Sequence, residues 1–172
     1  MKELKRVAAI HDISGVGKCS LTVALPIISA AGVECSVMPT AVLSTHTGGF
    51  EGFTFRDLTD DLRPIAEHWK KENICFDALY SGYLGSLGQI DIVRDIFEMF
   101  RTPETWIMVD PVMADNGRLY SLFTLDHVKG MAKLCGRADV IIPNRTEAAF
   151  MLEREYRDGP MREEEVNDLL YA

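Results

Sequence analysis

The feature that most constrains the fold is a regular alternation of short apolar runs with longer segments of helical period. Each run has the length of a β-strand and is bounded by Gly, Pro, Asp or Asn, and the five runs are Val7 to Ile10, Cys35 to Met38, Ala78 to Tyr80, Trp106 to Val109, and Val140 to Ile142. Between the runs, apolar residues recur at i, i+3, i+4 and i+7, as in Leu62, Ile65, Ala66 and Trp69. This alternation predicts an α/β fold with a mostly parallel central sheet and helices on both faces.

Helix ends are marked by a few individual residues. Gly32 is a helix stop, and Thr124 and Thr146 are candidate N-caps, neither with Glu or Gln three residues later to complete a capping box. Residues 161–172 have helical composition but no strand follows them. With no repeat or linker, we expect residues 1–172 to form a single domain that is incomplete at its carboxy-terminal end.

Composition and charge exclude several classes of function. The chain has 172 residues, 47% of them hydrophobic, and a formal net charge of −8, and no basic run provides the surface that a nucleic-acid binder needs. The apolar stretch near the amino terminus is only four residues long, far below a membrane span. Four cysteines without a C-x-x-C pair indicate free thiols in a reducing compartment, so we expect a cytoplasmic protein.

Small and polar residues gather where each expected strand ends. The segments are 12–18, 39–49, 81–86, 110–117 and 143–147. Ligands of parallel α/β sheets bind beyond the carboxyl ends of the strands, and glycine lets backbone N–H groups approach a ligand closely. The pattern therefore predicts a small-molecule site at this edge of the sheet.

The segment from Gly15 to Lys18 invites a P-loop interpretation, which fails on two of its four fixed positions. Asp12 stands where the first glycine belongs, and Cys19 stands where the magnesium-binding hydroxyl belongs. The Rossmann fingerprint fails as well, because Ser20 occupies the position of its third glycine. Taken alone, this segment fits a tight strand-to-helix turn as well as it fits a ligand site.

The set of strand-end segments, taken in order, is more specific. A glycine-rich first turn with an aspartate is followed by Leu-Ser-Thr-His-Thr-Gly-Gly-Phe (43–50), Ser-Gly-Tyr-Leu-Gly (81–85), Val-Asp-Pro-Val-Met (109–113) and Pro-Asn-Arg-Thr-Glu (143–147). From about Val7 to Glu147, the chain resembles the amino-terminal portion of pyridoxal kinases, members of the ribokinase-like superfamily. The resemblance implies a ribokinase-like fold in which Leu43 to Phe55 form a small flap outside the main sheet.

The resemblance also implies roles for eight residues. In the substrate site these are Asp12, Ser14, His46, Thr47 and Tyr83; in the nucleotide site they are Asp110, Asn144 and Glu147, and Asp110 and Glu147 would also hold the metal. The implied cofactors are ATP and Mg²⁺. Simpler explanations stay open for three of them: the His46 side chain could bond its own loop, Tyr83 could be a core residue, and Glu147 could complement the charge at a helix N-terminus.

Two departures from the family pattern stand out. Ala114 replaces a glycine that many relatives have after Asp-Pro-Val-Met. The carboxy-terminal Gly-x-Gly-Asp segment, which supplies the family's catalytic base and anion hole, occurs nowhere in the 172 residues. The resemblance thus places no catalytic residue in this chain, and we expect the chain to be nearly inactive alone.

The expected activity is transfer of a phosphoryl group from ATP to the 5′-hydroxymethyl group of pyridoxal, pyridoxamine or pyridoxine. The alternatives are a hydroxymethylpyrimidine kinase of thiamine synthesis, against which the Ser-x-His-Thr and Ser-Gly-Tyr segments argue, and a non-catalytic fragment. We expect a homodimer formed through the flap, no nucleic-acid or membrane partner, and convergence of Asp110, Asn144 and Glu147 on one cavity with residues 12–18.

Overall fold

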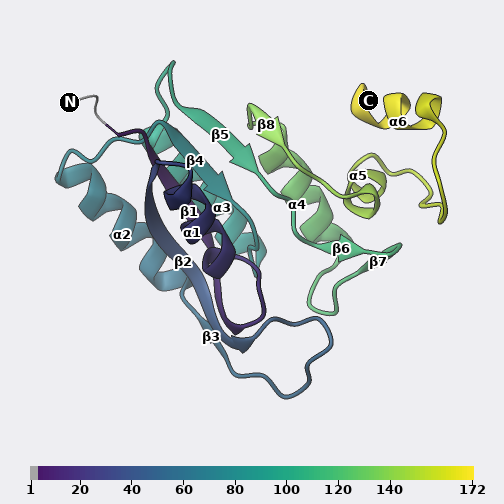
Figure 1. Ribbon diagram of the computed structural model, residues 1–172, viewed down its shortest axis with the longest axis horizontal. Helices are drawn as coiled ribbons and strands as arrows, with labels where there is room; N and C mark the ends of the chain where they lie inside the picture. Colours follow the sequence, from purple (N-terminus) through teal and green to yellow (C-terminus); the bar gives the residue numbers. More distant parts are fainter. Residues whose placement is uncertain (1–3) are drawn as a thin grey trace.

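The computed structural model describes residues 4–172 and follows the predicted alternation (Figure 1). In chain order the elements are β1 (Arg6–Val16), α1 (Leu21–Ala30), β2 (Glu34–Thr45), β3 (Phe55–Asp57), α2 (Thr59–Lys71), β4 (Ala78–Ser81), α3 (Leu87–Phe100), β5 (Trp106–Val109), β6 (Ala114–Asp115), β7 (Arg118–Leu119), α4 (Leu125–Cys135), β8 (Val140–Ile141), α5 (Arg145–Met151) and α6 (Glu163–Leu170).

The five predicted runs lie in parallel strands of one six-stranded sheet, except that Ile142 follows the end of β8. The strand order is β3-β2-β1-β4-β5-β8, and only β3 pairs antiparallel, with β2. The chain leaves β1 for β2 on one side and later returns to β4 on the other side of β1. The space between the carboxyl ends of β1 and β4 is therefore the topological switch point, where ligands of open α/β sheets bind.

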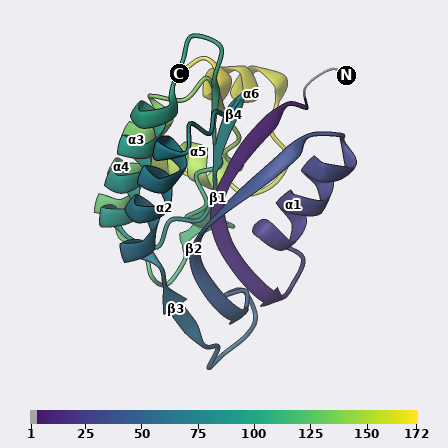
Figure 2. The ribbon, with the colours of Figure 1, turned by 90° about the vertical axis from the view of Figure 1, so that its left-hand side faces the viewer.

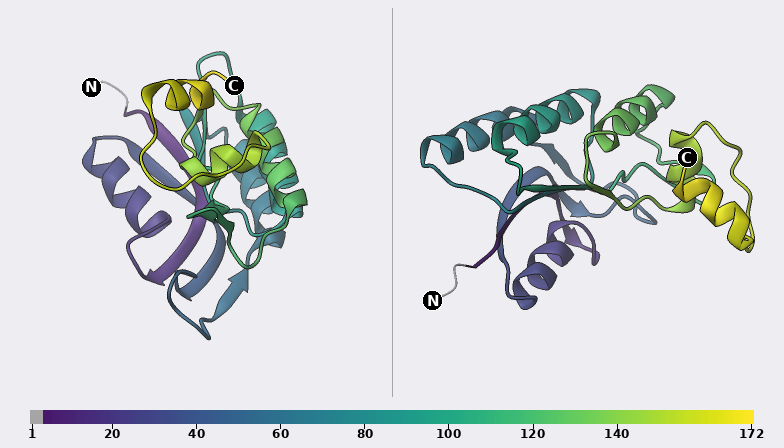
Figure 3. Two further views of the ribbon diagram at one scale, coloured as in Figure 1. Left: turned by 90° about the vertical axis from the view of Figure 1, so that its right-hand side faces the viewer. Right: turned by 90° about the horizontal axis from the view of Figure 1, so that it is seen from above.

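Helices cover the two faces of the sheet unequally. Helices α2, α3 and α4 lie side by side on one face, whereas α1 packs on β1 and β2 from the opposite face (Figure 2; Figure 3, right). The core lies under the three-helix layer, where Leu79 and Ile107 of the sheet meet Val93 and Phe97 of α3 and Met131 of α4, all at most 1% exposed. The prediction of helices on both faces is confirmed.

The first strand and the predicted flap differ from expectation. Strand β1 continues through a bulge after His11 to Val16, paired with β2, so Asp12 lies on a strand and the turn is confined to residues 17–20. Both ends of the predicted flap are also in the main sheet, because β2 extends to Thr45 and Phe55 pairs with Leu43. Pairing satisfies the backbone groups of these segments. Only residues 46–54 form a loop outside the strands.

Helix caps were predicted with mixed success. Thr124 caps α4, with its hydroxyl accepting from the N–H of His127, and Gly32 has a φ of 80° just past the end of α1. The prediction for Thr146 was wrong, because Asn144 is the N-cap of α5 and forms a full capping box with Glu147. Among residues 4–172 no helix is long and apolar enough to cross a membrane.

Candidate functional site

A cavity of about 280 Å³ opens at the switch point, at the carboxyl ends of β1, β2 and β4. Its wall contains all five residues predicted to bind substrate, which are Asp12, Ser14, His46, Thr47 and Tyr83. The rest of the lining includes Lys18, Leu43, Gly48 and Val112, which fall in the predicted strand-end segments, and Cys19, Ser20 and Tyr120, which lie outside them. Asp12 and Tyr83, which are 71 positions apart in the chain, thus line the same cavity.

Asp12 places a buried carboxyl group in the wall of this cavity. Its carboxylate is 4% exposed and accepts hydrogen bonds from the hydroxyls of Ser14, at 2.9 Å, and Ser20. Ser20 has a φ of 51°, a conformation that costs a residue with a side chain free energy. The bond to Asp12 offsets part of that cost, so the tight turn before α1 and the position of the carboxylate depend on each other.

His46 bonds its own loop, as the simpler explanation held, and it also lines the cavity. The N–H of Gly48 donates to its Nδ1 at 3.1 Å, so the ring proton of the neutral form is on Nε2. The ring packs edge-on against Phe50 and lies directly over Gly17, where a Cβ atom would come within 2.1 Å of the His46 ring. A glycine is therefore required at position 17 for the ring to occupy this place.

Tyr83 belongs to the core and to the cavity at once. The side chain is 8% exposed, packs against Phe123 with ring centroids 5.6 Å apart, and forms part of the cavity wall. Its buried hydroxyl has no hydrogen-bond partner among residues 4–172. Burial, followed by the negative charges of Asp12 and Asp57, raises the pKa of Tyr83 to about 12. The phenol is therefore protonated at neutral pH.

The three residues predicted for the nucleotide lie at the ends of the neighbouring strands β5 and β8. Asp110 follows β5, and Asn144 and Glu147 begin α5 just after β8. They stand at the same edge of the sheet as Asp12, as predicted, but they are not among the residues that line the 280 Å³ cavity. Val112, two residues after Asp110, forms part of the cavity wall and connects the two regions.

Asn144 and Glu147 form a dense hydrogen-bonded unit. The Asn144 side chain accepts from the N–H groups of Thr146 and Glu147 and donates to the carbonyl oxygen of Ala114 at 2.8 Å. The Glu147 carboxylate is 3% exposed and accepts from the N–H groups of Asn144, at 2.8 Å, and Met113, at 3.1 Å. Capping of α5, the simpler explanation for Glu147, is therefore present in the structure.

The two carboxyl groups of this region have raised pKa values. Burial raises the pKa of Asp110 to about 6, and its carboxylate has no side-chain hydrogen bond or ion pair among residues 4–172. Burial, with repulsion from Asp110 as a smaller cause, raises the pKa of Glu147 to about 7 despite its bonds to backbone N–H groups. A nearby cation would stabilise both ionised forms.

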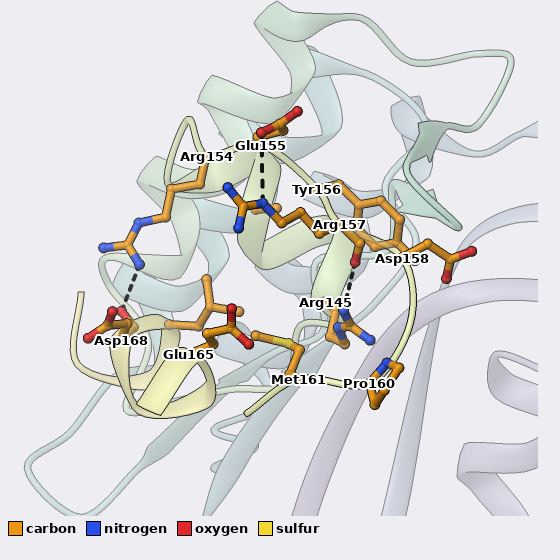
Figure 4. A pocket seen from close by; sticks show the side chains of 12 residues that line it. Arg145, Arg154, Glu155, Tyr156, Arg157, Asp158, Pro160, Met161, Glu165 and Asp168 are labelled. Atoms are coloured by element: carbon orange, nitrogen blue, oxygen red, sulfur yellow. Dashed lines mark hydrogen bonds and ion pairs between the residues drawn. The ribbon is translucent and has the colours of Figure 1, made fainter. Parts of the chain in front are cut away.

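A second hollow of about 420 Å³ lies between α5 and α6 (Figure 4). Arg145 donates to the carbonyl oxygens of Gly159 and Arg157, and Arg154 donates to that of Asp168, so two of its three arginines hold the surrounding loop. None of the eight predicted site residues lines this hollow.

The missed cavity residues differ in whether the sequence carried a signal for them. Ser20 stands directly before the apolar period of α1, where a hydroxyl residue is a candidate cap, so its position could have been flagged. Tyr120 carries no such signal, because the β6–β7 hairpin brings it to the cavity from beyond β5.

Comparison with known proteins agrees with this geometry. A family model described as phosphomethylpyrimidine kinase matches residues 25–171. A crystal structure assigned as a phosphomethylpyrimidine kinase from Bacteroides thetaiotaomicron superposes with a TM-score of 0.93 and 47% identity, covering 99% of this chain and 58% of that one. A second crystal form of the Bacteroides protein was solved with pyridoxal, again at 47% identity and a TM-score of 0.93.

Pyridoxal kinases are also among the similar proteins. The pyridoxal kinase of Lactobacillus plantarum superposes with a TM-score of 0.85 and 35% identity over 92% of this chain and 56% of its own. The pyridoxal kinase of Arabidopsis thaliana is 28% identical over 144 residues, which are 80% of this chain and 45% of that protein. The fold is ribokinase-like, and the similar proteins named above are kinases.

The chain belongs to the phosphomethylpyrimidine kinase family, and its similar structures include pyridoxal kinases. It spans about half the length of the curated relatives it matches.

Proposed function

We propose that the protein is an ATP-dependent kinase that phosphorylates the 5′-hydroxymethyl group of pyridoxal, pyridoxamine or pyridoxine. The observation that carries the proposal is the cavity at the switch point, whose wall combines an aromatic ring, a buried carboxylate and an unpartnered phenol. Pyridoxal in the crystals of the Bacteroides relative, at 47% identity, supports it. A flat, substituted pyridine ring offers the polar groups and the apolar surface that such a wall can bind.

The residues of the cavity would hold the ring in place. The Tyr83 phenol, protonated at neutral pH, would donate a hydrogen bond, and the Asp12 carboxylate would accept one beside the hydroxyls that already orient it. Ser14, His46 and Thr47 would bound the rest of the ring. Phosphoryl transfer depends mainly on positioning and on neutralising phosphate charge, so a rigid cavity contributes directly to the rate.

The neighbouring group would serve the nucleotide. Asp110, Asn144 and Glu147 would form the side of the site that faces the triphosphate. A magnesium ion bound there would neutralise charge that develops on the phosphates. The unpartnered carboxylate of Asp110 and the raised pKa of Glu147 fit a cation held by one or two carboxylates together with phosphate oxygens and water. Among residues 4–172 no cluster of three or more His, Cys, Asp or Glu side chains could hold a metal unaided.

The catalytic base would lie outside the 172 residues. The resemblance places the base in a Gly-x-Gly-Asp segment, which this sequence does not contain. General-base catalysis contributes about 10²- to 10⁴-fold to a rate. The 172-residue chain assayed alone would therefore release almost no ADP, and a chain that binds pyridoxal without turnover is the non-catalytic alternative.

The second candidate is a hydroxymethylpyrimidine kinase, which is favoured by the match to the phosphomethylpyrimidine kinase family. Its substrate also has a hydroxymethyl group on a flat nitrogen heterocycle, so the same cavity would accommodate either ring. The two candidates differ in which ring the Tyr83 and Thr47 side chains position better.

One experiment separates these candidates. ADP release would be measured with Mg-ATP and either pyridoxal, pyridoxamine or hydroxymethylpyrimidine, using the whole protein that contains this chain and, in parallel, the 172 residues alone. We expect release to be far faster with the B6 vitamers and almost absent from the 172 residues. A preference for hydroxymethylpyrimidine would transfer the function to the second candidate, and robust turnover by the 172 residues would overturn the assignment of the base.

A further inference from the structure

Gln89, in the first turn of α3, is a buried polar residue that does not line the cavity. Its side chain is 0% exposed, although it carries two N–H donors and a carbonyl acceptor. A buried amide costs free energy unless its polar atoms find partners. The location of those partners indicates what the residue does.

The amide of Gln89 bonds to three separate segments. Its Oε1 accepts from the N–H of Gly85 at 2.7 Å, and its Nε2 donates to the carbonyl oxygen of Thr40 at 3.0 Å and to the hydroxyl of Thr59 at 2.9 Å. The same Nε2 lies 3.5 Å from a carboxylate oxygen of Asp57. One side chain therefore links the loop after β4, the middle of β2, and the junction of β3 with α2.

Thr40 completes the connection. Its buried hydroxyl donates to the carbonyl oxygen of Tyr83 at 3.0 Å, while its own carbonyl receives the Gln89 amide. The backbone is held on both sides of Leu84, which is itself 0% exposed. The loop that carries the Tyr83 ring is thus fixed to β2 at two points.

These bonds join two parts of the cavity wall. Tyr83 forms one part, and β2 leads from Thr40 to Leu43 and on to Thr47 in the other. Neither Gln89 nor Thr40 lines the cavity. We propose that Gln89 is a positioning residue, whose amide sets the separation between the Tyr83 part of the wall and the part formed by Leu43 and Thr47, and so the fit of the substrate ring; the inference rests on the function proposed above.

The test uses two variants and a matched control. Gln89→Met keeps the length of the side chain and removes every hydrogen bond of the amide. Thr40→Val is a milder change that removes only the bond to Tyr83, and it serves if Gln89→Met does not fold. The control is Thr105→Val: Thr105 is 5% exposed and donates to the carbonyl oxygen of Phe76 at 3.1 Å, at the opposite, amino-terminal end of the sheet.

Three quantities would be measured on the whole protein that contains this chain: the affinity for pyridoxal, the affinity for Mg-ADP, and the hydrogen-exchange rate of the Gly85 amide relative to the amides of β5. We expect Gln89→Met to weaken pyridoxal binding about tenfold and to speed exchange of the Gly85 amide by about the same factor, because one buried hydrogen bond is lost at each part of the wall. Thr40→Val should weaken pyridoxal binding less. Mg-ADP affinity should not change in either variant, because the nucleotide residues are attached to β5 and β8.

Other outcomes overturn the inference. If Thr105→Val weakens pyridoxal binding as much as the two variants do, or if Mg-ADP affinity falls in step with pyridoxal affinity, Gln89 acts through general stability and positions nothing. Unchanged pyridoxal affinity in both variants refutes the inference directly. If the unmodified protein binds neither pyridoxal nor hydroxymethylpyrimidine, the proposed function fails; the Gly85 exchange rate then decides by itself whether Gln89 joins the two parts of the wall.

Discussion

Replacing Glu147 by Gln should change how the stability of the protein depends on pH. Burial raises the pKa of Glu147 from 4.5 to about 7, so the folded state binds its proton more tightly than the unfolded state does. The protonated carboxyl thus contributes stability that is fully present below pH 4.5 and is lost as the pH rises through about 7. The E147Q side chain is neutral at every pH, so its contribution stays constant and is not lost as the pH rises through about 7.

The size of the effect follows from the shift. A rise of about 2.5 pKa units, at about 1.4 kcal/mol per unit, corresponds to at most about 3 kcal/mol of unfolding free energy. The Gln side chain has one carbonyl oxygen for the two N–H groups, of Asn144 and Met113, that Glu147 satisfies. Leaving one of them unsatisfied costs about 1–3 kcal/mol at all pH values. E147Q should therefore be less stable than the original protein at pH 5 and about equal to it, or more stable, at pH 8.

Urea unfolding followed by circular dichroism at several pH values from 5 to 8 measures this difference, because titrating groups distant from Glu147 cancel between the two proteins. Glu165→Gln is the matched control, since Glu165 also completes a capping box, but at the exposed start of α6, where Arg162 lowers its pKa. A stability difference between E147Q and the original protein that is independent of pH would refute the reasoning.

Three further predictions concern packing, assembly and the metal. Gly82→Ala should destabilise the protein by roughly 1–3 kcal/mol in thermal unfolding, because the new Cβ would lie 2.1 Å from the buried His11 ring. Gly88→Ala is the control: the atom nearest to its new Cβ would be 3.7 Å away, so it should not be destabilised in this way. Light scattering of the whole protein should show a homodimer, and a strict monomer would contradict this. Phe50→Ser should weaken the dimer, since Phe50 is 42% exposed on the loop of residues 46–54. Removing magnesium with EDTA should abolish ADP release and leave pyridoxal binding nearly unchanged, and loss of both would show that the two sites are not separate.

Much of the architecture was readable from the order of residues alone. The five apolar runs became the five parallel strands because a short apolar run bounded by turn residues favours a strand through its own composition. Local signals also sufficed for the cap at Thr124 and the stop at Gly32, where a side chain or a φ value acts within three or four residues.

Long-range pairing decided what the local patterns could not. The residues from Asp12 to Val16 look like a turn by composition, but pairing with β2 makes them a strand, and β3 similarly extends the sheet where a free flap was expected. The cap of α5 went to Asn144 rather than Thr146, and it is held partly by the carbonyl oxygen of Ala114, 30 positions away.

The sequence by itself determined the fold class and which residues gather at the strand ends, because both follow from hydrophobic period and from the direction of parallel strands. Only the tertiary structure decided that Asp12, His46 and Tyr83 share one cavity, while Asp110 and Glu147 lie outside its wall. It also brought Gln89 between the two parts of the cavity wall. The physical reason is that burial, hydrogen bonding across strands and shifts in pKa depend on neighbours distant in sequence, which no local pattern specifies.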